Sequence, residues 1–412
     1  MQIGAFCKNC IVRVRTSFLG FLSRRDPAEY FIALMLLGVT AFGVRCLACG
    51  SEAFTEIFHI GTRDLFMDFF NSVRDAAQGA ASYTERGVIY PPLANLLFLM
   101  LSRLIPTAYL DTPTGAMAHT WRFYNGALLS LVLFFAVSLV LFALALGREG
   151  YSARKGAAFT FFMLVSFPVI FMVERGNVVV LALVALVIFA QNYQSESPTR
   201  REVALLALAV AAALKLYPAL FGLIMLADKR YRDASRAALY TVILLVVPSF
   251  FFGGPVSLWY VLKNTFSFSS TGENATNFML RFGLSPEAGT AILCVLYFIA
   301  LTVLLLSSLV QKTAWKTWMF AGAVMLTFSS IFSAYNWLLL LPALLTFMRT
   351  ERLRGINWLY FFAMSLPFYI YIPKPLQDNG LIVLIALMIT LSVLETVRLY
   401  VAARGKKRTP TA

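Results

Sequence analysis

Residues 124–146 read YNGALLSLVLFFAVSLVLFALAL, and no charged side chain interrupts this stretch. A helix crosses the hydrocarbon core of a bilayer with about 20 apolar residues, so this stretch is long enough to span a membrane. Further apolar runs lie near 30–46, 157–173, 178–193, 203–214, 217–227, 237–252, 288–310, 317–332, 336–348, 356–372 and 380–400. Because lipid offers no hydrogen-bond partners to an open backbone, these runs predict helices. The expected fold is an all-α, polytopic bundle of about 11–13 transmembrane helices.

The composition excludes a soluble protein with an ordinary surface. Hydrophobic residues make up 59% of the 412 residues and charged residues only 13%, against about 25% in a typical soluble domain. So few charges cannot cover the outside of a core that contains this much apolar surface. The same composition rules out a disordered chain.

The formal net charge of +15 has a topological explanation. If segment 91–106 does not cross the membrane, the segments between the spans alternate sides, and the basic excess falls on the side of the N-terminus. This is the positive-inside pattern, and it predicts that both termini are cytoplasmic. Segment 91–106 is then expected to dip into the outer interface or to lie along it. The basic excess is therefore not assigned to nucleic-acid binding.

One catalytic domain is expected over residues 30–400. It follows a cytoplasmic segment, 1–29, and precedes a basic cytoplasmic tail, 401–412. Two long outer loops, 47–123 and 253–287, elaborate the outer face of the predicted bundle.

Polar residues collect at the predicted outer ends of the spans. Apolar runs break at Glu174-Arg175-Gly176-Asn177, at Lys215-Leu216-Tyr217-Pro218 and at Ser333-Ala334-Tyr335-Asn336. Charged groups near bilayer depth are expensive, so they tend to be functional or closely paired. The structural alternatives are a snorkelling lysine at Lys215, an ion pair of Arg175 with Glu174 or a loop acid, and a helix cap at Asn336.

The first outer loop contains acids on a predicted helix. Apolar residues recur with helical spacing over 65–78, which predicts an amphipathic helix at the membrane interface. This helix carries Asp68, Asn71 and Asp75, and Asp64 precedes Asp68 by four residues, which is one helical turn. Its acids are candidates for a general base, with a solvated carboxylate as the alternative.

Three cations of the outer segments, Arg175, Lys215 and Arg281, are candidates for binding a phosphate, because cations offset its charge at low dielectric. Aromatic residues and access from the lipid suit a long-chain substrate. The combination predicts transfer chemistry on a lipid phosphate at the outer interface.

At these residues the chain resembles the polyprenol-phosphate-dependent glycosyltransferases of family 87, which belong to the C-type (GT-C) integral membrane glycosyltransferases. The resemblance runs over about residues 30–350 and rests on an ordered set of motifs. These are Asp68-Phe69-Phe70-Asn71, Tyr90-Pro91-Pro92-Leu93, Arg175-Gly176-Asn177-Val178 and the Ala-rich helix ending in Lys215-Leu216-Tyr217-Pro218. The chain departs from the family late in the sequence, where a Pro is missing and Asn336 stands where a His is common.

The resemblance implies a GT-C-like bundle whose active site lies on the outer face of a bacterial plasma membrane. The implied donor is a sugar, commonly mannose, on polyprenyl phosphate, and the implied acceptor is a glycolipid or a glycan. The implied mechanism is inverting, with Asp68 as the general base and Asp64 as its rival. Lys215, Arg175 and Arg281 are expected to contact the donor phosphate. Expected substrate contacts are Asn71, Tyr90, Asn177 and Asn336. No metal and no cofactor is expected.

A transporter or flippase of lipid-linked or anionic substrates is the alternative function. Broken helices with polar residues at their ends occur in transporters too. The polar motifs here gather toward one face of the predicted bundle, and no convincing inverted repeat is present. The sequence therefore favours the enzyme.

Overall fold

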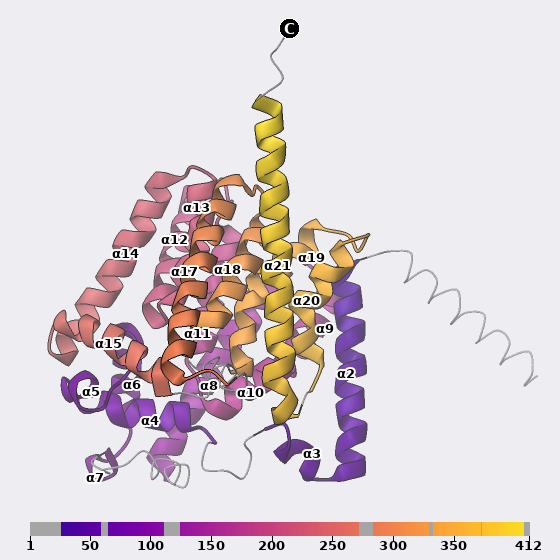
Figure 1. The fold of residues 1–412 in the computed structure, drawn as a ribbon. Coiled ribbons are helices and arrows are strands. Elements are labelled where there is room, and N and C mark those ends of the chain that lie inside the picture. The colour runs from indigo at the N-terminus through magenta and orange to yellow at the C-terminus, as the bar shows by residue number, and fades with distance from the viewer. Residues whose placement is uncertain are drawn as a thin grey trace, which may run out of the picture.

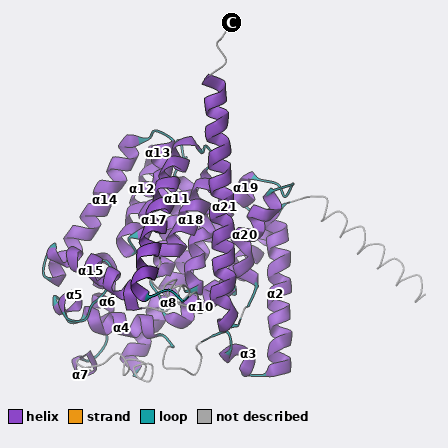
Figure 2. Cartoon of the chain, viewed as in Figure 1, coloured by secondary structure: helices purple, strands orange, loops and turns teal. Residues whose placement is uncertain are grey.

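The computed structural model describes residues 26–58, 65–110, 124–271, 283–328, 333–371 and 373–407. Within these ranges the chain forms helices joined by loops, and no strand is present (Figure 2). The predicted all-α class is confirmed.

The main helices run side by side through the molecule (Figure 1). They are α2 (Pro27–Cys49), α8 (Asn125–Gly147), α9 (Ala153–Leu164), α10 (Phe167–Arg175), α11 (Val179–Asn192), α12 (Pro198–Leu214), α14 (Tyr231–Ser249), α17 (Pro286–Val310), α18 (Ala314–Phe328), α19 (Leu341–Thr350), α20 (Asn357–Tyr369) and α21 (Lys374–Lys407). Short helical pieces extend three of them: η2 (Tyr217–Gly222) with α13 (Leu223–Ala227) follows α12, η3 (Phe250–Phe252) follows α14, and η4 (Ala334–Leu340) precedes α19.

A second group of elements comes from the two predicted outer loops. It comprises α3 (Glu52–Thr55), α4 (Met67–Ala76), α5 (Ala81–Thr84), α6 (Pro92–Ser102), α7 (Thr107–Leu110) and α15 (Val256–Thr271). α4 is the amphipathic helix that the spacing over 65–78 predicts. It buries Phe69, Phe70 and Val73 against the bundle, because these side chains recur on one face.

The structure is that of a multi-spanning membrane protein. Among the described residues, four helical segments are long and apolar enough to cross a membrane: Pro27–Cys49, Asn125–Gly147, Tyr231–Phe252 and Val383–Ala402. The pair Ala153–Leu164 and Phe167–Arg175, bent by 50°, can form a fifth span. Other apolar helices, such as α11, are shorter than a full span.

The predicted span 157–173 is a bent pair of helices in the structure. The helix α9 ends at Leu164, and α10 begins at Phe167 with Pro168 in its first turn. A proline is compatible with the first turn of a helix but not with its interior, where its ring clashes and an N–H is missing. The same rule separates α12 from η2, which has Pro218 in its first turn. The predicted break between the runs 203–214 and 217–227 is confirmed.

The two ends of the bundle differ chemically. At the lower end in Figure 1 lie α3, α4, α5, α6 and α7, and we call this the site end. At the opposite end, ion pairs join segments far apart in the chain: Lys155 Nζ lies 2.7 Å from Asp26 Oδ2, and Arg349 Nε lies 3.5 Å from the buried Glu149 Oε2. We call this the basic end. The basic end contains loops that the charge pattern predicts to lie on the same side of the membrane.

The segment 91–106 lies at the site end over its whole length. α6 begins after Tyr90, and the carbonyl oxygen of Leu104 lies against Gly126, in the first turn of α8, where an added Cβ would be only 2.4 Å away. α8 then runs to the basic end, where the carbonyl oxygen of Ala145 accepts a hydrogen bond from Gln191. Both ends of α6 therefore lie at one end of the bundle.

We expect Gly38→Ala to destabilise the fold. A Cβ at this position would lie 2.0 Å from the backbone oxygen of Tyr369, so α2 can keep its place against the end of α20 only with a glycine. Overpacking of this kind costs about 1–3 kcal/mol. Thermal unfolding of the protein in detergent would measure the loss. Gly43→Ala on the same helix is the matched control, because nothing lies within 4 Å of its Cβ. Equal melting temperatures for the two variants would contradict the prediction.

Candidate functional site

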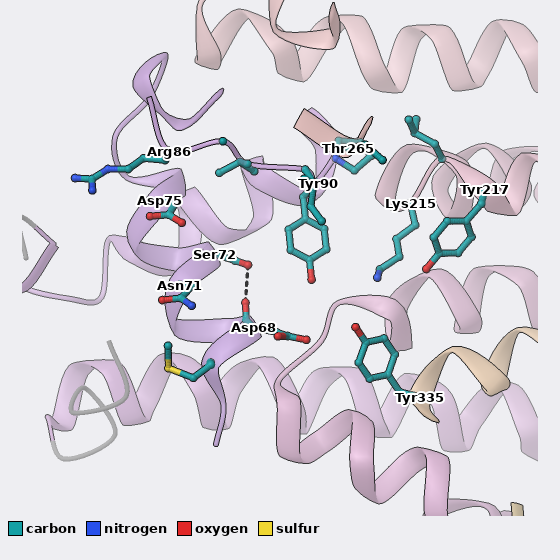
Figure 3. Close-up of a pocket in the computed structure, with 16 residues that line it drawn as sticks. Asp68, Asn71, Ser72, Asp75, Arg86, Tyr90, Lys215, Tyr217, Thr265 and Tyr335 are labelled. Carbon is teal, nitrogen blue, oxygen red and sulfur yellow. Dashed lines mark hydrogen bonds between the residues drawn. The ribbon is translucent and has the colours of Figure 1, made fainter. Parts of the chain in front are cut away.

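A cavity of about 330 Å³ opens at the site end, beside α4 (Figure 3). Its polar lining from α4 recurs at intervals of three and four residues, so one face of the helix borders the cavity while the opposite face packs into the core. The members of this face are Asp68, Asn71, Ser72 and Asp75. The loop before α6, the start of η2 and Tyr335 of η4 complete the walls.

The Asp68 carboxylate is held from the other side by the junction of α10 and α11. Arg175 Nη2 donates to Asp68 Oδ1 at 2.6 Å, and Asn177 Nδ2 donates to Asp68 Oδ2 at 2.7 Å. Both side chains of the ion pair are mostly buried, with 20% of Arg175 and 17% of Asp68 exposed. Hydrogen bonds to a charged group contribute about 1.5–3 kcal/mol each, so the two donors fix the carboxylate strongly.

The backbone brings these partners together. Gly176 ends α10 in a left-handed conformation, with φ of 72°, and a Cβ there would lie 2.5 Å from Phe69 Cβ. The Glu174 carbonyl oxygen accepts a 2.7 Å hydrogen bond from the N–H of Phe66, which is itself left-handed and precedes α4. The turn after α10 therefore lies directly against the first turn of α4, and Asp68 is in that turn.

Asn177 connects three parts of the site. The same amide nitrogen that donates to Asp68 also donates to the Tyr90 hydroxyl at 3.0 Å, while Asn177 Oδ1 accepts from the N–H of Val179 at the start of α11. Burial raises the pKa of Tyr90 well above its ordinary value, and the negative charge of Asp68 raises it further. Tyr90 is therefore a neutral phenol whose proton is available to a ligand.

Lys215 approaches the cavity from the end of α12, in the loop before η2. Its Nζ lies 5.4 Å from the ring centre of Tyr90, 5.7 Å from that of Tyr217 and 5.5 Å from that of Tyr335. A cation over aromatic faces is stabilised by the ring quadrupoles. Desolvation lowers the pKa of Lys215 to about 8, although Asp68 opposes this shift. No described carboxylate forms an ion pair with Lys215, so its charge is available to a ligand.

A comparison with family models identifies the protein class. The model of glycosyltransferase family 87 matches residues 89–334, which is more than half of the chain. The chain belongs to glycosyltransferase family 87. It is therefore a membrane glycosyltransferase, and the transporter alternative is set aside. No curated protein and no solved structure matched it.

The family 87 match covers less of the chain than the motifs predict. It includes Tyr90, Asn177 and Lys215, but it begins after Asp68 and ends before Asn336. The fold supplies the connection to Asp68, because Arg175 and Asn177 lie inside the matched range and both bond its carboxylate. The site of this family 87 protein thus combines a matched region with a helix that precedes it.

The structure brings most of the predicted site residues together. Asp68, Asn71, Tyr90 and Lys215 line the cavity, and Asn177 lies behind Asp68 and Tyr90. Arg175 is paired with Asp68, an acid of the first outer loop, which is the structural alternative that the sequence left open. The predicted phosphate contact of Arg281 and the rival base Asp64 lie outside the described residues.

α4 begins at Met67, after a left-handed Phe66, which is two residues later than the start of the helix predicted over 65–78. Asn336 is buried in η4 beside Tyr335, and its Oδ1 lies 3.5 Å from the Tyr217 hydroxyl.

Sequence reasoning missed the ring contacts of Tyr217 and Tyr335 with Lys215. The available signal was that both tyrosines stand where polar residues interrupt the apolar runs, at 215–218 and at 333–336.

Gly176→Ala should reduce both stability and sugar transfer. The new methyl group would meet Phe69 and would also occupy a left-handed residue, which costs roughly 1–2 kcal/mol without any clash. Gly150→Ala is the matched control, because Gly150 has φ of +75° but nothing within 4 Å of its Cβ. Thermal unfolding and transfer assays on both variants test this. Equal losses of activity would mean that the contact of Gly176 with α4 does not position Asp68.

Proposed function

We propose that this family 87 enzyme transfers a sugar from a polyprenyl-phosphate donor to a glycolipid or glycan acceptor, with inversion. The supporting observation is that a carboxylate with fixed orientation, Asp68, shares one cavity with an ammonium group, Lys215, that has no described counter-ion. The carboxylate can accept the proton of a hydroxyl group, and the ammonium can stabilise an anionic leaving group. Mannose is our proposal for the sugar, because it is common among the donors of the family.

In the proposed reaction Asp68 accepts the proton of the acceptor hydroxyl as its oxygen attacks the anomeric carbon. The bond from that carbon to the phosphate oxygen breaks, and the departing lipid phosphate keeps the electron pair. Lys215 stabilises this phosphate, because a nearby positive charge offsets the negative charge that the leaving group carries. A carboxylate has about four acceptor positions, so Asp68 can still take the proton while Arg175 and Asn177 donate to it.

We assign Arg175 and Asn177 to the positioning of Asp68. Their bonds hold the carboxylate in one orientation at the wall of the cavity. A phosphate contact of Arg175 stays a prediction. Tyr90 is proposed to donate its neutral phenol to a sugar or phosphate oxygen, because its hydroxyl lies beside Asp68 and its ring beside Lys215.

We propose that the site end faces outward and the basic end faces the cytoplasm. The basic end carries the lysines and arginines of the loops around Lys155, Arg230 and Arg349, which the positive-inside rule places on the cytoplasmic side. Short helices that end near the site place its polar groups near the lipid headgroups. A polyprenyl chain can then stay in the lipid while its phosphate enters the cavity.

Asp68→Asn should abolish transfer, since general base catalysis typically contributes about 10²–10⁴-fold. The assay uses purified protein in lipid with a panel of radiolabelled polyprenyl-phosphate sugars and a membrane glycolipid extract as acceptor. The amide keeps the shape of the side chain, so the variant should fold and still bind donor. Glu52→Gln, at an exposed acid on α3, is the control. Wild-type rates in a folded Asp68→Asn protein would exclude Asp68 as the base.

Donor use should depend on the charge of Lys215. Because its pKa is lowered to about 8, the ammonium is charged below this pH and neutral above it. We expect kcat/KM for the donor to fall tenfold per pH unit above about 8. Lys215→Arg should retain part of the activity and remove this fall, since a guanidinium stays charged. The same alkaline fall in the arginine variant would assign it to another group.

A further inference from the structure

The cavity continues along α4 beyond the proposed base. Asp75 lies seven residues after Asp68 on the same face, which is about 10 Å along a helix, and Asn71 lies between them. Arg86 and the loop to Tyr90 form the facing wall (Figure 3). The proposed reaction gives no role to this end of the cavity.

The polar groups at this end have unused hydrogen-bonding capacity. Arg74 donates through Nε and Nη2 to Oδ1 of Asp75, at 2.9 and 2.7 Å, and Oδ2 has no hydrogen-bond partner among the described residues. Asn71 Oδ1 is buried and has no donor within the described chain. An unsatisfied polar atom is costly, so such groups commonly mark a place where a ligand or water completes the bonding.

The charge balance at this end differs from that around Lys215. Arg74 neutralises Asp75 within the protein, and Arg86 is close enough to interact with the same carboxylate. A neutralised carboxylate beside an amide is suited to neutral hydroxyl groups, which need both acceptors and donors.

The geometry of the proposed reaction indicates which substrate places its hydroxyl groups at the Asp75 end of the cavity. In an inverting transfer the attacking oxygen and the departing oxygen lie on opposite sides of the anomeric carbon. Lys215 marks the departing side, and Figure 3 shows Asp68 between Lys215 and Asp75. The attacking hydroxyl and the rest of its molecule therefore approach from the Asp75 end.

We propose that Asn71 and Asp75 form an acceptor subsite that binds the hydroxyl groups of a sugar ring, so that the acceptor is a glycan or glycoside rather than a simple lipid alcohol. This inference rests on the proposed function for the order of donor and acceptor. Asp75 Oδ2 accepts from one hydroxyl, and the Asn71 amide, by turning about its terminal bond, serves the neighbouring one.

The wall that faces this subsite is attached to the second outer loop. Asn264 of α15 donates through Nδ2 to the carbonyl oxygens of Tyr83 and Val88, at 2.9 and 3.1 Å, and the neighbouring Thr265 lines the cavity. These bonds fix the loop that carries Arg86. The subsite therefore has two firm walls, as selective recognition of a sugar ring requires.

The first test separates the acceptor from the donor. At saturating donor, Asp75→Asn should raise KM for a glycan acceptor about tenfold, because a hydrogen bond to a charged group is lost, and leave KM for the donor within about twofold. Asn71→Ala should act in the same direction. Glu85→Gln, at an exposed acid near the same rim, is the control. A rise in donor KM with an unchanged acceptor KM would overturn the proposal.

The second test does not require transfer. Saturation-transfer NMR on the protein in nanodiscs would detect binding of methyl α-mannoside, methyl β-glucoside and methyl β-galactoside. We expect a signal from at least one glycoside in the wild type and in Asp68→Asn, and its loss in Asp75→Asn. Binding without transfer from any donor would retain the subsite and reject the proposed function. Transfer without an effect of Asp75→Asn in either test would reject the subsite alone.

Discussion

The ion pair between Asp68 and Arg175 is the interaction on which the site depends. A carboxylate that is mostly withdrawn from water needs partners, because its desolvation is costly. Here the partners come from the turn between α10 and α11, more than 100 residues further along the chain. The turn can reach Asp68 only because Gly176 allows the backbone to touch Phe69. One residue without a side chain thus determines where the only charged group on the first turn of α4 points.

The short helices of this protein also follow from the need to bring polar partners to a buried carboxylate. A continuous membrane helix satisfies its own backbone and offers no place for polar side chains to converge. Each interruption at the site end exposes backbone groups and introduces a polar residue: Asn177 after α10, Lys215 after α12 and Tyr335 in η4. Asn177 shows how the two effects are reconciled, since its Oδ1 satisfies a backbone N–H of α11 while its nitrogen serves the site.

The sequence predicts the helices well because hydropathy is a local property. The runs 124–146 and 178–193 coincide with α8 and α11 within two residues. The bend between α9 and α10 was missed, because Ser166 and Pro168 lie inside an apolar run that no charged side chain interrupts. The motifs named Asp68, Tyr90, Asn177 and Lys215, but they could not show that Arg175 pairs with Asp68 or that three tyrosines surround Lys215. Those contacts join segments far apart in the chain, so only tertiary packing reveals them.

The arrangement of charges explains how an acid and a cation can share a small cavity without forming an ion pair with each other. A direct pair between Asp68 and Lys215 would neutralise both groups, and a phosphate would have to compete with the carboxylate for the ammonium. Arg175 prevents this by serving as the counter-ion of Asp68 from behind. Lys215 is left among aromatic rings, which stabilise its charge without neutralising it. In the proposed reaction the two groups act on opposite sides of the anomeric carbon, so the guanidinium of Arg175, which keeps Asp68 from pairing with Lys215, is as necessary to that chemistry as either group.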